Sequence, residues 1–396
     1  MKKDWEYKTI KEIGTVIGGT TPSTNNKEYW DGEHCWISPA ELDGSHYLYD
    51  SVRKVTDKAV KDKNLKLLPI GTVILSSRAP IGKVTINKIP TYCNQGFKCV
   101  ICGNRVYNEF LYWWFWGKTE YLNSIGTGAT FKEISKKVVE NIIIPVPPLS
   151  EQKEIVEYLD SSFAKIDKLK ENAAKNLEEA KALFQSALKN ALEPKEGWEY
   201  CEFSKVVDSL RTGLNPRVHF KLNTEDAQGY YVTVRELKGF TFEIDSKTDR
   251  INDAAIKRIN ERSNLQIGDV LFSGTGTIGR TALVEEEPTW WNIKEGVYAI
   301  TPNKNRLESK FLIYLFKSDL ILNKIYSKAS GATIRSIPMK ELNKIVLPIP
   351  PLSEQQSIVS FLDSLNEKLN TLQQNYSRIC DECDALKQAI LRQVFE

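Results

Sequence analysis

The chain has 396 residues and a formal net charge of +3, with 41% hydrophobic and 27% charged residues. This length exceeds one ordinary hydrophobic core, so two or more domains are expected, and the composition excludes a wholly disordered or fibrous chain. No apolar run approaches the roughly 20 residues of a membrane-spanning helix, and the N-terminus lacks the apolar segment of a secretory signal. We therefore expect a cytoplasmic protein with no membrane partner.

Residues 1–148 predict a mixed α/β domain. Short β-rich runs at 72–75 and 98–101 lie among Gly, Pro, Asn and Asp turns, and 108–115 has a helical pattern. We interpret the tryptophans of that helix as a buried face rather than as a surface that stacks on bases. A similar mixture of short strands and helices in 194–350 predicts a second mixed domain.

A long helix is predicted over 149–193 and another over 351–396. A Pro-Pro pair precedes each, a serine (Ser150 or Ser353) is placed to cap it, and apolar residues then alternate by three and four. We expect the two helices to pair as an antiparallel coiled coil, although two separate amphipathic helices remain the alternative. The predicted seam contains Leu159, Ile166, Leu169, Leu183, Leu362, Leu369, Leu372, Ile379, Leu386 and Ile390.

The order of these segments follows an internal repeat. Residues 144–160 (IPVPPLSEQKEIVEYLD) and 347–363 (LPIPPLSEQQSIVSFLD) are identical at eleven of seventeen positions, at an offset of 203. A Gly-Ala-Thr triplet lies upstream of each, at 128–130 and 331–333. The expected fold class is therefore α+β: two mixed α/β domains in tandem, each followed by a long helix, with pseudo-two-fold symmetry.

Charge is divided between the predicted domains and helices. The domains carry net charges of +5 (1–148) and +3 (194–350), whereas the helices carry −2 (149–193) and −3 (351–396). This distribution favours domains that touch phosphate groups and helices that do not.

Catalytic motifs are weak in this sequence. Phe272–Gly276 (FSGTG) matches the glycine-rich loop of S-adenosylmethionine methyltransferases, but a strand pattern follows it instead of the helix that a nucleotide loop needs. Neither Pro-Pro pair has the flanking residues that hold a target base, and the three histidines are dispersed. Cys99 and Cys102 would face opposite ways on a strand, which argues against zinc. We predict no catalytic, cofactor-binding or metal site in this chain.

Two copies of a P-P-L-S-E-Q-x-x-I-V helix start, each closing a variable domain that ends in G-A-T, resemble the specificity subunit of type I restriction–modification systems. The resemblance covers the whole chain. It implies that the domains 1–148 and 194–350 are target recognition domains, each reading one half of a split DNA site. It also implies that the helices 149–193 and 351–396 set the gap between the half-sites and dock methyltransferase subunits.

The resemblance further implies which partners the chain has. They are double-stranded DNA, methyltransferase subunits that hold S-adenosylmethionine and methylate adenine, and restriction subunits that translocate and cut DNA with ATP and Mg²⁺. The chain itself would be a non-catalytic recognition subunit that binds none of these cofactors.

Candidate DNA-contacting residues lie in turns at equivalent places of the two repeats. Each could instead be an ordinary solvated surface residue. The candidates are Thr20, Thr21, Ser23, Arg78, Lys83 and Lys132 in the first repeat, and Arg211, Arg217, Arg280 and Arg335 in the second.

Two other classes of protein stay open on the sequence. One is a free-standing enzyme, which the missing motifs argue against. The other is a scaffold that binds proteins through its coil and never touches DNA. Methylation by the lone chain would identify the first class, and the absence of sequence-selective DNA binding would identify the second.

Overall fold

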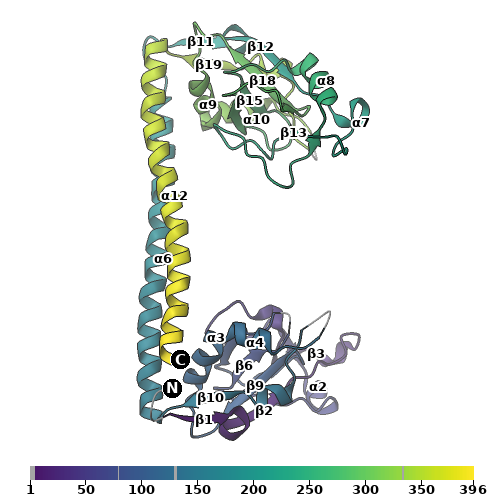
Figure 1. Ribbon diagram of the computed structural model, residues 1–396, viewed down its shortest axis with the longest axis vertical. Coiled ribbons are helices and arrows are strands. Elements are labelled where there is room, and N and C mark those ends of the chain that lie inside the picture. The colour runs from purple at the N-terminus through teal and green to yellow at the C-terminus, as the bar shows by residue number, and fades with distance from the viewer. Residues whose placement is uncertain (1–4, 79, 129–131, 332–333) are drawn as a thin grey trace. The chain divides into compact units, whose positions relative to one another are not determined.

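The chain forms two compact units in the computed structural model, which describes residues 5–78, 80–128, 132–331 and 334–396 (Figure 1). Unit 1 comprises residues 1–174 and 376–396, and unit 2 comprises residues 175–375. Each unit holds one mixed α/β domain with segments of two long helices, α6 (Leu149–Ala191) and α12 (Leu352–Phe395). The predicted fold class, with tandem mixed domains and long helices, is confirmed.

The domain of unit 1 is a five-stranded sheet of order β2-β9-β6-β7-β4, a three-stranded sheet of order β5-β3-β8, the two-stranded pair β1-β10, and short helices. Its elements are β1 (Glu6–Thr9), α1 (Ile10–Ile13), β2 (Gly14–Gly18), β3 (Trp30–Ile37), β4 (Tyr47–Leu48), β5 (Arg53–Val55), α2 (Asp57–Asp62), β6 (Val73–Ser76), β7 (Val84–Asn87), β8 (Tyr92–Cys93), β9 (Phe97–Cys102), α3 (Asn108–Gly117), α4 (Thr119–Ser124), α5 (Lys136–Glu140) and β10 (Ile143–Val146).

The domain of unit 2 repeats this plan with a four-stranded sheet of order β12-β18-β15-β16, a three-stranded sheet of order β14-β13-β17, and the pair β11-β19. Its elements are β11 (Glu199–Glu202), β12 (Val207–Thr212), α7 (Pro216–His219), β13 (Gly229–Val232), β14 (Arg250–Ile251), α8 (Asp253–Ser263), β15 (Val270–Ser273), β16 (Thr281–Leu283), β17 (Trp291–Ile293), β18 (Val297–Pro302), α9 (Ser309–Lys317), α10 (Asp319–Lys328), α11 (Met339–Leu342) and β19 (Val346–Ile349).

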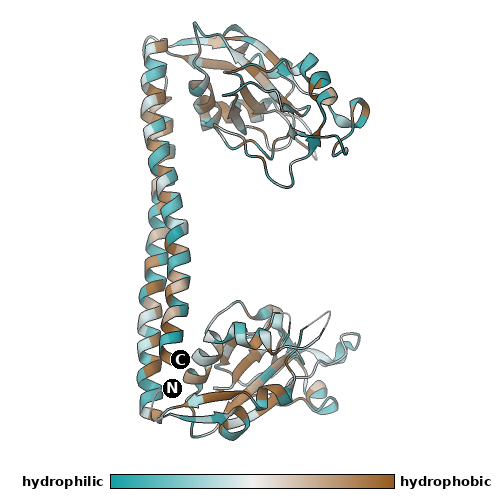
Figure 2. Cartoon of the chain, in the orientation of Figure 1, coloured by the Kyte–Doolittle hydropathy of each residue, from teal (hydrophilic) through white to brown (hydrophobic). Residues whose placement is uncertain are grey.

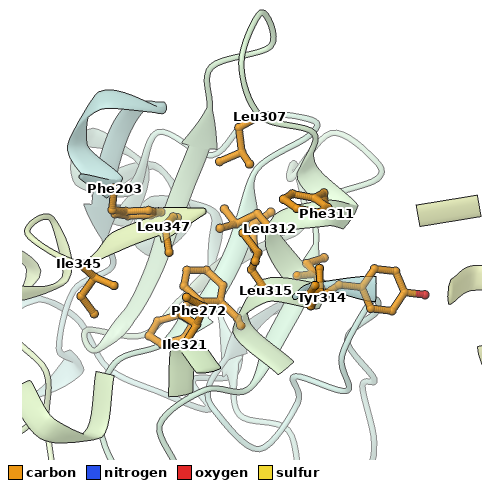
Figure 3. Close-up of a cluster of buried hydrophobic side chains, with 14 of the residues drawn as sticks. Phe203, Phe272, Leu307, Phe311, Leu312, Tyr314, Leu315, Ile321, Ile345 and Leu347 are labelled. Atoms are coloured by element: carbon orange, nitrogen blue, oxygen red, sulfur yellow. The ribbon is translucent and has the colours of Figure 1, made fainter. Parts of the chain in front are cut away.

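Each domain has its core around one central strand. Every residue of β6 and of β15 is buried, because the strand is paired on both edges and helix α3 or α9 packs nearby. The apolar strands run through the interior of both domains in Figure 2. Figure 3 shows the core of unit 2, where Phe272 of β15 belongs to the same buried cluster as Phe311, Leu312 and Leu315 of α9. Trp113 and Trp114 of α3 are buried in the core of unit 1, as predicted.

The glutamine of the repeated Ser-Glu-Gln motif fastens each long helix to its domain. Gln152 is fully buried; its Oε1 accepts from the Tyr107 N–H (2.8 Å), and its Nε2 donates to the carbonyls of Arg105 (2.9 Å) and Pro147 (2.8 Å). The helices begin at Leu149 and Leu352, one residue before the predicted serine caps.

Gln355 makes the same three bonds in unit 2. Its Oε1 accepts from the Glu308 N–H (2.9 Å), and its Nε2 donates to the carbonyls of Arg306 (2.7 Å) and Pro350 (2.9 Å). The repeat of the motif in the sequence is therefore a repeat of one docking contact between helix and domain.

The two long helices pair antiparallel within each unit. In unit 1, Lys170 of α6 lies 2.9 Å from Asp384 of α12, and Asp167 lies 2.5 Å from Lys387, so numbers rise along one helix as they fall along the other. In unit 2, the end of α6 (Phe184, Leu188) shares one core with the start of α12 (Ile358, Leu362). The alternative of two separate amphipathic helices is thereby excluded.

The predicted seam needs correction on α6. Leu159 and Ile166 are buried, but Leu169 and Leu183 are 58% and 71% exposed. Side chains one residue later, such as Phe184, face inward instead. Neighbouring helix residues lie about 100° apart, so both flank the seam, and only packing decides which one enters it.

The same error occurs on α12. Leu362 is buried and Leu369 packs against the core of unit 2, while Ile379 and Ile390 are half-buried. Leu372 and Leu386 are 44% and 49% exposed, so the seam prediction is wrong there. The inward residue beside Leu386 is Lys387, whose Nζ lies 5.0 Å from the centre of the Phe163 ring.

Candidate nucleic-acid interface

Backbone hydrogen bonds join three loop segments of unit 1 into a structure that we call frame 1, made by Ser77, Gly96, Thr127, Glu133 and Ile134. The Ser77 N–H donates to the Gly96 carbonyl (2.8 Å), and the Ile134 N–H donates to the Ser77 carbonyl (2.9 Å). Thr127 and Glu133 exchange two further bonds of 3.0 and 2.9 Å. Segments far apart in sequence are thus held at the end of the buried strand β6.

Frame 2, made by Gly274, Gly296, Ser330, Ser336 and Ile337 of unit 2, has the same bonds. The Gly274 N–H donates to the Gly296 carbonyl (2.8 Å), the Ile337 N–H donates to the Gly274 carbonyl (2.9 Å), and Ser330 and Ser336 exchange bonds of 2.9 and 2.8 Å. The two domains therefore build one backbone scaffold twice, at the ends of β6 and β15.

Charged side chains gather on frame 1. The half-exposed carboxylate of Glu133 lies 3.2 Å from the buried Nζ of Lys98 and 3.8 Å from Nη1 of Arg78. Lys98 also donates to the Ser77 hydroxyl (3.0 Å). Lys132 is exposed beside them. Two cations at the Glu133 carboxylate, with Lys132 next to it in sequence, leave frame 1 with an excess of positive charge, which suits contact with phosphate groups.

Amide and hydroxyl groups extend frame 1 toward the segment after β2. The Thr20 N–H donates to the Cys93 carbonyl (2.9 Å), which brings this segment against the turn between β8 and β9. The Thr21 hydroxyl bonds the Gln95 side-chain oxygen and accepts from the Asn94 amide (2.9 Å). Gln95 itself is exposed. An exposed amide held in place by a neighbour can present its donor and acceptor to a ligand.

Frame 2 borders a cavity of about 530 Å³ lined by polar side chains. Within it the Thr275 and Ser336 hydroxyls are hydrogen-bonded (2.9 Å), and Nη1 of Arg262 lies 3.8 Å from the Glu295 carboxylate. Burial raises the pKa of Tyr298, whose hydroxyl donates to the Ile337 carbonyl (2.6 Å). The lining consists of Thr212, Asn215, Arg262, Thr275, Lys294, Glu295, Gly296, Tyr298, Ser336 and Met339.

The structure brings part of the predicted set together. Thr20, Thr21, Arg78 and Lys132 converge on frame 1. On frame 2, the exposed Arg335 is the counterpart of Lys132, and its carbonyl accepts from the Gly276 N–H (2.9 Å).

Ser23 and Arg217 are exposed on the segments that follow β2 and β12. The Ser23 carbonyl accepts from Nε1 of Trp30 (3.1 Å), and the Arg217 N–H donates to the side chain of Asn215 (3.1 Å), which lines the cavity.

The remaining basic candidates are tied to their own domains. Nζ of Lys83 donates to the Leu42 carbonyl (2.5 Å), and Nη1 of Arg280 donates to the Val234 carbonyl (3.3 Å). Arg280 is exposed and can still reach a ligand, whereas Lys83 is half-buried.

Arg211 departs from the prediction. Its side chain is only 14% exposed, and its Nη2 lies 2.8 Å from the fully buried carboxylate of Asp269. The pairing of β12 with β18 places it there, because β15 is the next strand in the sheet. A buried carboxylate requires a partner, so Arg211 serves the core of unit 2 and we leave it out of the interface.

Sequence reasoning missed the polar residues of the turns before β9 and β18, namely Gln95 and Glu295, and the acid Glu133. Aligning Gly96 with Gly296, at an offset of 200, would have exposed the turn pair Asn-Gln-Gly and Lys-Glu-Gly. Most of each Gly-Ala-Thr triplet cannot be placed, because Ala129, Thr130, Ala332 and Thr333 lie outside the described residues, as does Ala79.

Two further searches cover only the described part of the chain. There, no group of three His, Cys, Asp or Glu side chains is placed to hold a metal ion. No helix among those residues is long and apolar enough to cross a membrane.

Comparison with known sequences points to one family. The family model for the type I restriction modification DNA specificity domain matches twice, at residues 2–179 and 195–379. The specificity subunit of type I restriction enzyme MjaIX from Methanocaldococcus jannaschii is 33% identical over 398 residues, covering 93% of this chain and 88% of that protein. The EcoR124I/EcoR124II specificity subunit of Escherichia coli is 32% identical over 180 residues, 44% of each chain.

Solved structures share the fold. A chain from a study of complex assembly and conformational transition in a type I R-M system has a TM-score of 0.77 at 22% identity, covering 100% of this chain and 98% of that one. The HsdS subunit from Thermoanaerobacter tengcongensis has a TM-score of 0.61 at 20% identity, covering 100% and 97%. This chain therefore belongs to the family of type I restriction–modification DNA specificity subunits. Its two tandem domains are the DNA-recognising parts, and a scaffold that never touches DNA does not fit this family.

Proposed function

We propose that the chain reads a bipartite DNA target, one half-site per domain, as the non-catalytic subunit of a type I restriction–modification complex. The observation that carries the proposal is the pair of frames, which repeat one backbone scaffold with different side chains on it. Base edges carry sequence information, whereas phosphate contacts set position. A backbone scaffold that recurs with different side chains supports two domains that recognise different half-sites.

The antiparallel helix pair is proposed as the spacer that sets the gap. α6 has 43 residues and α12 has 44, so each is about 65 Å long at 1.5 Å per residue. Inserting four residues into both helices adds about 6 Å of helix. The expected target keeps both half-sites and has a longer gap. An insertion variant that assembles and still selects the original gap would contradict the spacer role.

Methyltransferase subunits are proposed to dock on two exposed leucine pairs. Leu169 and Leu386 lie at the same level of the helix pair in unit 1, beside the inter-helix ion pairs, and both are about half exposed. Leu183 and Leu372 are their counterparts in unit 2 at the offset of 203. Single exposed leucines are common on protein surfaces, so the support comes from their recurrence at equivalent places, which suits two copies of one partner.

The chemistry is proposed to reside in the partners. Methyltransferase subunits would hold S-adenosylmethionine and methylate adenine in each half-site, and restriction subunits would use ATP and Mg²⁺ to translocate and cut DNA. The chain itself would contribute recognition and assembly in the cytoplasm, without a cofactor of its own.

The DNA-binding proposal is tested on the complex assembled with its methyltransferase subunit. A random duplex pool should yield two short constant blocks separated by a fixed gap. Lys132→Ala and Arg335→Ala should weaken binding equally for all sequences and lower the salt slope by about one each, because each would lose one phosphate contact. Lys175→Ala, on the exposed surface of α6, is the matched control. Unchanged affinity in both frame variants would remove these residues from the interface.

The docking proposal has its own test. Leu169→Glu and Leu183→Glu should each weaken the binding of one methyltransferase subunit, measured by the mass of the assembled complex. Leu67→Glu, at a 50% exposed leucine of the unit 1 domain, is the control. Full assembly of both helix variants would show that these leucines are ordinary surface residues.

A further inference from the structure

We infer that Gln95 in unit 1 and Glu295 in unit 2 are specificity-determining residues, each of which selects a base from the same position on its frame. The inference rests on the proposed function, since it names the residues by which the two half-sites differ. It begins from the turns before β9 and β18, which are equivalent in backbone and different in side-chain chemistry.

The backbone holds both turns in the same way. In unit 1, the Phe97 N–H donates to the Asn94 carbonyl (3.2 Å), and the Gly96 carbonyl accepts from Ser77 (2.8 Å). In unit 2, the Val297 N–H donates to the Lys294 carbonyl (3.0 Å), and the Gly296 carbonyl accepts from Gly274 (2.8 Å). The residue before the glycine therefore occupies one fixed place in each domain, whatever its side chain.

The flanks of each turn are anchored while its tip is exposed. Cys93 and Phe97 are 3% and 0% exposed on either side of Gln95, and Ile293 and Val297 are 0% and 2% exposed on either side of Glu295. Gln95 is exposed, and the Glu295 side chain is 47% exposed. A polar side chain that has no role in the core, on a backbone that cannot shift, is pre-organised for a ligand.

The neighbouring residues orient the Gln95 and Glu295 side chains but leave part of their hydrogen-bonding capacity free. The Thr21 hydroxyl bonds the Gln95 oxygen, and an amide oxygen has a second acceptor site. The Glu295 carboxylate is 3.8 Å from Nη1 of Arg262, which is too long for a hydrogen bond. Glu295 also lines the cavity beside frame 2. The Gln95 amide can therefore donate and accept a further hydrogen bond, and the Glu295 carboxylate can accept one.

The chemistry of the two tips predicts different bases. A glutamine amide pairs with the N6 and N7 atoms of adenine in the major groove, whereas a glutamate carboxylate accepts from the N4 amino group of cytosine. The same turn would thus select adenine through unit 1 and cytosine through unit 2.

The neighbouring positions of the two frames differ as well. Arg78 and Glu133 of frame 1 correspond to Thr275 and Ser336 of frame 2. The exposed side chains differ between the two frames, whereas the glycine (Gly96 or Gly296) and the isoleucine (Ile134 or Ile337) whose backbone groups bond the frame recur.

The test is the pair of near-isosteric exchanges Gln95→Glu and Glu295→Gln, in the complex assembled with its methyltransferase subunit. Bound duplexes are selected from a random pool and sequenced. Gln95→Glu should change one position of one half-site from adenine toward cytosine, with a loss of about tenfold or more on the original target. Glu295→Gln should make the reverse change in the other half-site. Gln374→Glu, at an exposed position of α12, should change neither.

The outcomes separate this inference from the proposed function. If the wild-type complex selects no bipartite sequence, the proposed function fails. If it does, but both exchanges leave every base preference unchanged, the specificity role is overturned and the function stands. A loss that is uniform over all sequences would assign the turns to phosphate contact and also overturn it. Thermal unfolding of each variant, expected to match that of the wild type, shows that the domains remain folded.

Discussion

The two halves of the helix pair use different side chains for the same contact. In unit 1, two inter-helix ion pairs, Lys170–Asp384 and Asp167–Lys387, lie along the seam. At the offset of 203, their counterparts in unit 2 are Gln373 with Lys181 and Asn370 with Phe184. None of these counterpart pairs joins opposite charges, and Phe184 is buried in the core of unit 2. The antiparallel backbone arrangement recurs, whereas the chemistry that stabilises it does not.

The domains show the opposite division between constant and variable parts. The contacts that hold a helix on its domain recur residue for residue, as Gln152 and Gln355 show. The exposed tips of the frames differ, as Gln95 and Glu295 show. Burial explains the difference, because a buried group must keep its hydrogen-bond partners, whereas an exposed group can change with the ligand.

Exchange of one domain gives the largest expected effect. Replacing residues 198–340 with the matching segment of a relative should change one half-site completely and leave the other intact. Affinity for the original target should fall on the order of 10³-fold, toward non-specific binding. Sequencing of DNA bound or methylated by the assembled complex measures this. A change in both half-sites would show that the two units do not read independently.

Removal of the docking glutamines comes next. Gln152→Ala and Gln355→Ala each leave three backbone groups without their partner, and an unsatisfied buried group costs about 1–3 kcal/mol. We expect the free energy of unfolding to fall by about 3 kcal/mol or more in either variant, measured by denaturant titration. Gln374→Ala, at an exposed position, should change it by less than about 0.5 kcal/mol. Very different losses of unfolding free energy for the two glutamine variants would show that the two docking contacts are not equivalent.

A pH effect should distinguish unit 2 from unit 1. Burial lowers the pKa of Lys317 to about 8, an effect that Asp363 only partly offsets. The ammonium group lies 4.1 Å from the centre of the Phe240 ring and 5.9 Å from that of Tyr314. The matching residue of α3 is Trp116, which cannot titrate.

The direction in which stability changes with pH follows from proton binding to Lys317. Between pH 8 and about 10, the unfolded chain holds a proton on Lys317 that the folded chain has released, so stability rises with pH in this window. We expect a rise on the order of 1 kcal/mol in wild type and none in Lys317→Met. Denaturant titrations from pH 7 to 10 measure it. An equal rise in the variant would assign the effect to other groups.

The ion pairs of unit 1 should matter least. Lys387→Met removes the charge that faces Asp167 but keeps an apolar stem over Phe163. Because Asp167 is 60% exposed, the loss should stay below about 1 kcal/mol and shrink further in high salt. A larger loss would mean that the ion pairs, rather than the apolar seam, hold the helices together in unit 1.

The sequence anticipated the parts of the molecule that depend on local pattern. The repeat at 144–160 and 347–363 predicted two long helices after two mixed domains, and the structure has them. The phase of the seam could not be predicted, because alternating spacings of three and four fit two neighbouring sets of residues. Phe163, which is absent from the predicted set, enters the seam because it also packs against Trp113 and Trp116.

The candidate interface was only partly predictable, because contacts between distant segments decide which side chains reach it. Arg78 and Lys132 were singled out as basic residues in turns, and both lie on frame 1. Arg211 looked equally suitable, but sheet pairing turned it toward Asp269. Glu133 and Gln95 carry no basic charge, and only backbone bonds between distant segments bring them beside Ser77.

The sequence by itself determined the family, the duplicated architecture and the positions of the helices, because periodicity, proline and the repeated motif act over a few turns of chain. Tertiary structure alone decided which leucines left the seam and which polar side chains met on the frames. These depend on packing and on hydrogen bonds between residues 19 to 74 apart, such as Ser77 with Gly96 and Thr21 with Gln95. The frames lie at the ends of the buried strands β6 and β15, so the packing of these strands positions the segments that carry the contacts.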